Sequence, residues 1–189
     1  MLSGRRLDLL DPSPLDVEIE DIAHGLARVA RWNGQTIGEH AFSVAQHSVI
    51  VEELCCALSP SLTPDERLTA LLHDGSEYVI GDMISPFKSA LGDHYRVFED
   101  RLEKAIHLRF GLPALMPRGL KKIIKQADHI CAWHEAVQLA GFTSVEADQI
   151  FGAPKVEMSV RLDPLTPTDA QKAMLDRFHE IQEQRKRQT

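Results

Sequence analysis

Residues 67–74 read RLTALLHD, and this short stretch decides how the rest of the chain is interpreted. Its leucines recur at helical spacing, and the helix that they predict ends at the adjacent pair His73 and Asp74. The expected start is Thr63, which can cap the first turn while Glu66 completes a capping box. The stretch therefore predicts a short buried helix that brings a histidine and a carboxylate to one place.

Two other segments supply residues of the same chemical kind. His47 lies on the apolar face of a helix that we expect over residues 41–58, and Asp128 lies on a long helix expected over residues 117–140. Asp128 shares its helix face with Cys131, so the pattern directs its carboxylate toward the interior. A buried carboxylate without a partner is costly, which indicates that Asp128 has one.

Each of these residues has an ordinary interpretation when it is taken alone, such as a core histidine or a surface aspartate. A single divalent metal ion would account for all four of them, namely His47, His73, Asp74 and Asp128. Two neutral imidazoles and two carboxylates suit a divalent transition metal and leave coordination positions open for water and substrate. We therefore expect one metal ion, and the residues do not distinguish Mn, Co, Ni, Fe, Zn and Mg.

Two acidic residues follow the His-Asp pair closely. Glu77 and Asp82 lie in a segment, residues 77–91, that we expect to be irregular because Gly81 and Pro86 interrupt it. Glu77 is either an exposed loop residue or a carboxylate that orients water on the metal and shuttles its proton. Asp82 either caps the turn or faces the leaving group of a reaction.

Arg31, Trp32 and Lys88 are the candidate substrate-binding residues. Arg31 either satisfies carbonyl groups at a helix end or binds phosphate with its planar guanidinium group. Trp32 is either a core residue or a ring that stacks on a base. Lys88 is either solvated or a second cation for phosphate. The Asn-Gly pair at residues 33–34 favours a turn, which allows Arg31 and Trp32 to face one cleft.

The length suits one domain, because 189 residues are enough for a sizeable core. We expect the domain to be cytoplasmic, for two reasons that its sequence gives. No apolar run reaches membrane-spanning length, and the first residues lack the apolar core of a secretory signal. Cys55, Cys56 and Cys131 make a poor disulfide framework, which is typical of a reducing compartment. A net charge of -7 argues against nucleic acid and leaves a small phosphorylated substrate, whose charge a cation and a few arginines can offset.

The hydrophobic periodicity predicts an all-α fold, a single domain over residues 1–189 with its core at about 20–140. We expect residues 1–20 and 154–167 to be mainly loops, the former with at most short strands. Beyond the helices already named, we expect further helices over residues 19–30, 94–110 and about 167–186.

Several segments together resemble the bacterial 5′-deoxynucleotidase branch of the HD-domain metal phosphohydrolases. They are the pair Arg31-Trp32, FSVAQHS at residues 42–48, HDGSEYVIGDMISPFK at residues 73–88 and KQADHICA at residues 125–132. The resemblance covers about residues 20–140. It implies an HD-domain helical bundle-like fold, often dimeric, in which one divalent metal is held by His47, His73, Asp74 and Asp128.

The same resemblance implies a phosphomonoesterase that acts on nucleoside 5′-monophosphates, including the deoxy forms. Glu77 and Asp82 would serve the nucleophilic water and the leaving oxygen. Arg31 would hold the phosphate, and Trp32 would contact the sugar or base. Two alternatives stay open, an alarmone or other nucleotide hydrolase and a nucleotide-binding module without turnover.

Overall fold

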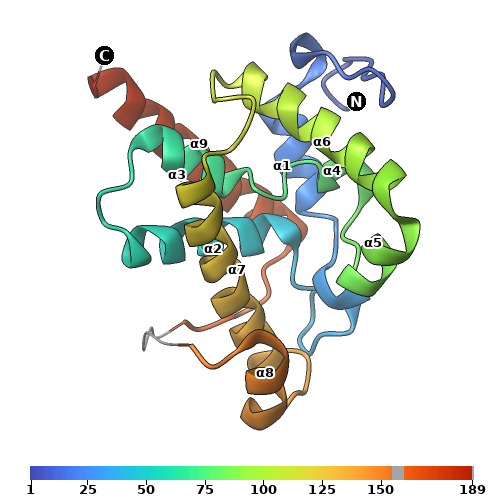
Figure 1. Cartoon of the computed structure of the whole chain (residues 1–189), viewed down its shortest axis with the longest axis vertical. Coiled ribbons are helices and arrows are strands. Elements are labelled where there is room, and N and C mark those ends of the chain that lie inside the picture. The colour runs from blue at the N-terminus through green and yellow to red at the C-terminus, as the bar shows by residue number, and fades with distance from the viewer. Residues whose placement is uncertain (155–159, 189) are drawn as a thin grey trace.

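The computed structural model describes residues 1–154 and 160–188, and every regular element in these ranges is helical (Figure 1). The expected all-α class is therefore confirmed. The α-helices in chain order are α1 (Ile19–Leu26), α2 (Val44–Leu58), α3 (Pro64–Leu71), α4 (Glu77–Ile80), α5 (Ser85–Leu91), α6 (Asp93–Arg109), α7 (Arg118–Gln138), α8 (Ser144–Phe151) and α9 (Pro167–Gln188), and two 3₁₀ turns are η1 (Pro14–Asp16) and η2 (Arg31–Gly34).

Local capping explains where the site-bearing helices begin. The Thr63 hydroxyl accepts the backbone N–H of Glu66, whose carboxylate accepts the Thr63 backbone N–H in return, so the expected capping box of α3 is confirmed. The Ser43 hydroxyl caps α2 by accepting the Gln46 N–H. The helix that we expected from residue 41 therefore begins at Val44, and α1 ends four residues earlier than expected, at Leu26.

Helix α2 lies at the centre of the molecule and packs against α3, α7 and α9, and Figure 1 shows α7 crossing it. The helix α9 closes one side of this core with Met174, Phe178 and Ile181, all of which are buried. A second apolar cluster joins α2 to α7, with Val51 and Cys131 fully buried in it. This packing fixes α7 beside α2, so that residues 88 positions apart in the chain become neighbours.

Two segments differ from the sequence-based expectation. Residues 77–91 are irregular only in part, since residues 81–84 have no regular structure but the short helices α4 and α5 form on either side of them. Gly81, which adopts a positive φ, ends α4 as expected. Helix α8 was not expected at all, although a complete capping box at Thr143 and Glu146 opens it. Short helices are poorly marked by periodicity, since they contain too few turns to show an apolar stripe.

A close contact between α1 and α4 places the start of α4. Gly25 lies so near Tyr78 that a Cβ atom added there would be 2.8 Å from both Tyr78 Cβ and Tyr78 O. Glycine permits this approach because it has no side chain. The contact holds Glu77, the first residue of α4, at a fixed depth in the interior.

Among the described residues, no helix combines the length and the apolar character that crossing a membrane requires.

Candidate functional site

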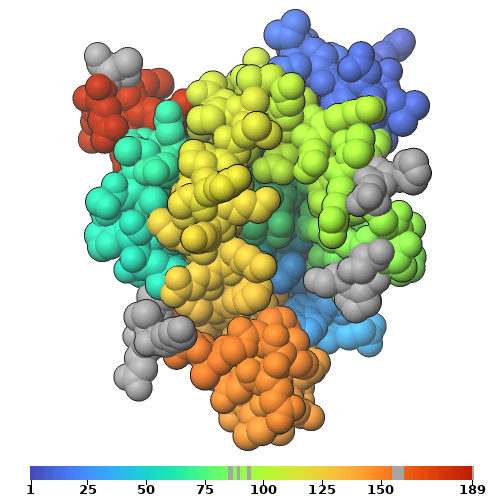
Figure 2. Space-filling view, in the orientation of Figure 1, coloured from blue at the N-terminus to red at the C-terminus, as the bar shows by residue number. Residues whose placement is uncertain are grey.

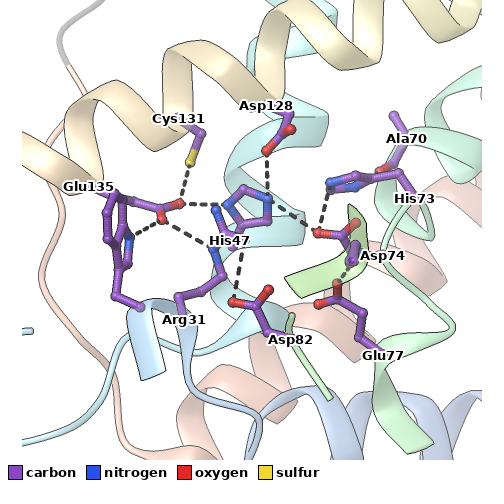
Figure 3. Close-up of polar contacts among 12 residues, drawn as sticks. Arg31, His47, Ala70, His73, Asp74, Glu77, Asp82, Asp128, Cys131 and Glu135 are labelled. Atoms are coloured by element: carbon purple, nitrogen blue, oxygen red, sulfur yellow. Dashed lines mark hydrogen bonds and ion pairs between the residues drawn. The ribbon is translucent and has the colours of Figure 1, made fainter. Parts of the chain in front are cut away.

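The four expected metal ligands come together from three segments of the chain (Figure 3). His47 projects from α2, Asp128 projects from α7, and His73 with Asp74 follows the end of α3. His47 Nε2 lies 3.3 Å from Asp128 Oδ1 and 3.6 Å from Asp74 Oδ2. His73 Nε2 lies 3.2 Å from the same Asp74 oxygen. One small cation could contact all four side chains with small adjustments.

The two histidines each use one ring nitrogen for a hydrogen bond and direct the other toward the cluster. Nδ1 of His47 lies 2.6 Å from Glu135 Oε1, and Nδ1 of His73 lies 2.9 Å from the carbonyl oxygen of Ala70. Since both partners are acceptors, each Nδ1 carries a proton, and Nε2 is the nitrogen of each ring that can coordinate a metal ion. Both Nε2 atoms are buried without a hydrogen-bond partner, which is the state that a metal ligand requires.

The electrostatics of the cluster also suit a cation. Burial opposes the charge on Asp74, but His73, His47 and Arg31 hold its pKa well below its usual range. Burial likewise opposes the charge on Asp128, and the contact with His47 lowers its pKa. Both carboxylates therefore remain ionised at neutral pH. The residues present fit a divalent metal ion in both charge and ligand type.

Glu135 is a central residue of the site that the sequence analysis overlooked. It is fully buried on α7, and its carboxylate contacts four side chains, those of Arg31, Trp32, His47 and Cys131. Burial opposes its charge, but Arg31 and His47 hold its pKa far below the usual value. Its spacing from Asp128 could have identified it in the sequence. Glu135 lies seven residues, about two helical turns, after Asp128, so the two side chains share one face of the helix.

Glu77 lies deep in the site rather than in an exposed loop. Its side chain is 3% exposed, Oε1 lies 3.3 Å from Lys88 Nζ, and Oε2 is buried without a hydrogen-bond partner. Burial, together with the charges of Asp74 and Asp82, raises the pKa of Glu77 to about 9, although Lys88 opposes the shift. A carboxyl group with a raised pKa next to ionised carboxylates can hold and exchange a proton near neutral pH.

Asp82 follows α4 and lies 3.6 Å from the Arg31 guanidinium, with both side chains largely buried. Burial raises the pKa of Asp82, while the charge of Arg31 acts in the opposite direction. Lys88 on α5 lies between Glu77 and Glu99, 3.3 and 3.1 Å from their carboxylates. Arg31 and Lys88 are thus each held by two carboxylates of their own, Arg31 by Asp82 and Glu135 and Lys88 by Glu77 and Glu99.

Arg31 and Trp32 share the turn η2, whose backbone has an unusual conformation. Trp32 and Asn33 adopt the left-handed region with φ of 56° and 52°, which costs a non-glycine residue about 1 kcal/mol or more. Because of this bend, Arg31 Nε and Trp32 Nε1 both donate to Glu135 Oε2, at 3.1 and 2.7 Å. The Trp32 ring lies against the rings of Phe142 and Phe151.

A cavity of about 390 Å³ opens from the cluster. Its walls are formed by the cations Arg31 and Lys88, the carboxylates Asp74, Glu77, Asp82 and Asp128, the imidazole of His129, and the largely apolar or aromatic Trp32, Met83, Ile84, Ala132, Ile150 and Phe151. Figure 2 shows this face hollowed between α7 and the green α5–α6 segment. All the expected substrate-binding residues line the cavity, and α8 supplies a wall that the sequence analysis did not anticipate.

A second trio of possible ligand atoms is less suited to a metal. His47, Cys131 and Glu135 also lie close together. However, the Glu135 carboxylate is already bound to the positive charge of Arg31, which opposes another cation there. Burial raises the pKa of the Cys131 thiol to about 12, which opposes the thiolate that a metal requires. The Nε2 side of His47, where the cavity begins, is therefore the better candidate for a metal site.

Two bacterial proteins are similar to this chain over nearly all of its length. The Rhodobacter capsulatus protein named "Uncharacterized protein RCAP_rcc00048" is 56% identical over 183 residues, which cover 95% of this chain and 92% of that protein. The Escherichia coli K12 protein named "Uncharacterized protein YfdR" is 32% identical over 171 residues, which cover 90% and 88% of the two chains. No family model matches the chain. Neither name states an activity, so a functional conclusion depends on the chemistry of the site.

Proposed function

This chain belongs to the family of RCAP_rcc00048 and YfdR, and we propose that it is a metal-dependent phosphohydrolase of the HD type. Its proposed substrates are nucleoside 5′-monophosphates, which it would hydrolyse to nucleoside and phosphate. The observation that supports this most directly is the convergence of two buried, unpartnered imidazole Nε2 atoms with two ionised aspartates at a cavity that also contains Arg31 and Lys88.

His47, His73, Asp74 and Asp128 would hold the metal. A divalent ion bound there would lower the pKa of a water molecule to near neutrality and would neutralise charge on a phosphoryl oxygen. The partly exposed carboxylates of Asp74 and Asp128 face the cavity, so a ligand of the metal can be reached from outside. Four protein ligands leave positions for water and substrate on an ion of higher coordination number.

Two cationic side chains would bind and orient the phosphate. The guanidinium group of Arg31 has the planar geometry that suits phosphate, and its contacts with Glu135 and Asp82 restrict its rotation. Lys88 also lines the cavity and supplies a point charge. These cations offset the surrounding carboxylates, so an anionic substrate can enter the site of an acidic protein.

The two acidic residues have complementary proposed roles. Glu77 is positioned beside Asp74, whose charge helps to raise its pKa. A bound cation would favour the ionised form of Glu77, which could then accept the proton of an attacking water molecule. Asp82 lines the same cavity next to Arg31, where it can donate a proton to the leaving 5′-oxygen. Burial raises its pKa, which favours the protonated form that this donation requires.

The aromatic wall supports a nucleoside rather than a small inorganic ester. Trp32 and Phe151 line the cavity beside Ile84 and Ile150. Bases stack on aromatic rings with a gain of roughly 1–3 kcal/mol for each base. A substrate with a phosphate at one end and a flat apolar group at the other would therefore match both halves of the cavity.

The proposal is tested by phosphate release from a panel of nucleotides and sugar phosphates, assayed with Mn²⁺, Co²⁺, Mg²⁺ and Ni²⁺. We expect release from nucleoside 5′-monophosphates and about one metal ion per chain in elemental analysis. His73→Ala and Asp128→Ala should lose both properties, because each removes a ligand. His179→Ala is the control, since His179 is exposed on α9, outside the cavity.

Other results would contradict parts of the proposal. Full metal occupancy in both ligand variants would show that the ligands are assigned wrongly. A wild-type protein that binds metal and nucleotide but releases no phosphate from any ester would indicate a nucleotide-binding module instead. Release from alarmones in preference to monophosphates would favour the other hydrolase class.

A further inference from the structure

We infer that Glu135 is a positioning residue that holds the metal ligand His47 and the substrate-binding turn η2 in one shared geometry. The inference deepens the proposed function, on which it rests for the roles of His47, Arg31 and Trp32. It concerns a residue that touches neither metal nor substrate and acts through its neighbours, since Glu135 does not line the cavity.

The two carboxylate oxygens of Glu135 serve two different parts of the site. Oε1 accepts hydrogen bonds from His47 Nδ1 at 2.6 Å and from Cys131 Sγ at 3.2 Å. Oε2 accepts hydrogen bonds from Trp32 Nε1 at 2.7 Å and from Arg31 Nε at 3.1 Å. The residue is fully buried, so no water competes for these contacts.

The hydrogen bond to Oε1 determines the tautomer and the orientation of the proposed metal ligand His47. Glu135 accepts a hydrogen bond from the Nδ1–H group of His47. This bond selects the tautomer of His47 whose Nε2 lone pair faces Asp74 and Asp128. It also fixes the plane of the imidazole ring and increases its basicity as a ligand. Loss of such a carboxylate partner typically weakens metal binding about 10–100-fold.

The hydrogen bonds to Oε2 hold the turn η2, which carries the proposed substrate-binding residues Arg31 and Trp32. Trp32 and Asn33 hold a left-handed backbone that non-glycine residues seldom adopt. Strained conformations of this kind persist only where the surroundings hold them in place. The hydrogen bond from Trp32 Nε1 anchors the turn, and the bond from Arg31 Nε directs its guanidinium group toward the cavity.

A carboxylate is required in this position because four donors surround it and one of them is cationic. A glutamine would keep a single acceptor oxygen and would turn an NH₂ group toward N–H or S–H donors on the other side. Either the His47 contact or the η2 contacts would then be lost. The ionised carboxylate also offsets the charge of Arg31, which glutamine would not do.

The test compares Glu135→Gln with two other variants. The readouts are the Mn²⁺ Kd from calorimetry and the KM for deoxyadenosine 5′-monophosphate, or its Kd if no hydrolysis occurs. We expect Glu135→Gln to weaken Mn²⁺ binding about 10–100-fold and to raise the KM. Trp32→Phe removes one donor to Oε2, and it should raise the KM while leaving the Mn²⁺ Kd within about twofold, as the assignment of the two oxygens requires.

Glu52→Gln is a matched structural control. Glu52 is also fully buried, contacts two arginines, Arg67 and Arg177, and accepts from a cysteine four residues away, Cys56. It belongs to the α2–α3–α9 interface, outside the cavity. This variant should lower the Tm without changing the Mn²⁺ Kd or the KM.

The inference is overturned if both the Mn²⁺ Kd and the KM of Glu135→Gln stay within twofold of wild type, or if Glu52→Gln loses metal binding equally. If Glu135→Gln fails to fold, Trp32→Phe becomes the test of the inference. An unchanged KM in Trp32→Phe would reject the role of Glu135 Oε2 in anchoring the turn η2. A wild type that binds Mn²⁺ but hydrolyses no monophosphate overturns the proposed function alone, because the Mn²⁺ Kd of the variants still tests Glu135.

Discussion

At the scale of the single residue, the buried carboxyl group of Glu77 lowers the folding stability of the protein but gives the site an acid for chemistry. Its carboxyl group is buried beside Asp74 and Asp82, and one of its oxygens has no hydrogen-bond partner. Burying such a group is unfavourable unless its charge is removed or compensated. The proposed catalytic use of Glu77 gives a reason for keeping an acid at a position where a neutral residue would be more stable.

We predict that Glu77→Gln stabilises the metal-free protein and abolishes phosphate release. In the folded protein the pKa of Glu77 is raised to about 9, so the folded state holds a proton that the unfolded state releases above about pH 4.3. Stability of the wild type is therefore lost as pH rises through this window, at up to about 1.4 kcal/mol per pH unit. Thermal unfolding with chelator at pH 5, 6.5 and 8 should show a Tm difference that widens with pH.

The exposed Glu39 supplies the control, because Glu39→Gln should change neither Tm nor turnover. A Tm difference for Glu77→Gln that stays constant or shrinks between pH 5 and pH 8 would show that Glu77 is ionised throughout. Unchanged phosphate release in Glu77→Gln would remove Glu77 from the proposed mechanism.

At the scale of the element, the contact of α1 with α4 sets the depth of Glu77. Gly25 faces Tyr78 at a distance that leaves no space for a methyl group. Any residue larger than glycine must push α4 outward or distort α1, and α4 begins at Glu77. The position of an acidic residue in the site thus depends on a glycine in another helix.

We predict that Gly25→Ala lowers the free energy of unfolding by about 1–3 kcal/mol, the usual cost of overpacking an interior contact. It should also reduce turnover while leaving the Mn²⁺ Kd nearly unchanged, since the four ligands lie on other segments. Gly119→Ala is the matched control, because its added Cβ on α7 would meet no other part of the described structure within 4 Å beyond its own helix backbone. That control should gain roughly 0.4–1 kcal/mol, and a Gly25→Ala protein as stable as wild type would refute the close contact.

At the scale of the whole molecule, the site joins helices that are otherwise held by apolar packing. The turn after α3 supplies His73 and Asp74, α2 supplies His47 and α7 supplies Asp128, so two carboxylates from different segments, those of Asp74 and Asp128, meet at His47 and repel each other. Their mutual repulsion opposes the packing of these helices. A cation bound to all three segments would remove the repulsion and connect them.

We therefore predict that Mn²⁺ raises the Tm. At a free concentration of about 100 times the Kd, the gain is about 2.7 kcal/mol, or roughly 5–10 °C for a chain of this size. Burial opposes protonation of His47, but Glu135 and Asp128 raise its pKa well above the usual value, so protons compete with the metal. The shift measured by calorimetry should accordingly shrink as pH falls. An equal shift in His73→Ala would place the ion elsewhere.

Much of this architecture could be predicted from local sequence patterns. Apolar periodicity and the Thr63 capping box are properties of neighbouring residues, so they predict α3, α6, α7 and α9 within a few positions. The chemical kind of the site was also visible, because His47, His73, Asp74 and Asp128 are ligand-type residues on segments expected to be buried. Local patterns determine which helices form and which side chains they carry.

The arrangement of those side chains was decided only by the tertiary structure. The role of Glu135 depends on α7 lying across α2, which brings its carboxylate to His47 and Arg31, 88 and 104 residues away in the chain. The free Nε2 atoms depend on acceptors for Nδ1, and the cavity wall from α8 depends on where that short helix packs. Apolar burial is not directional, so sequence periodicity indicates that a face is buried without identifying what covers it.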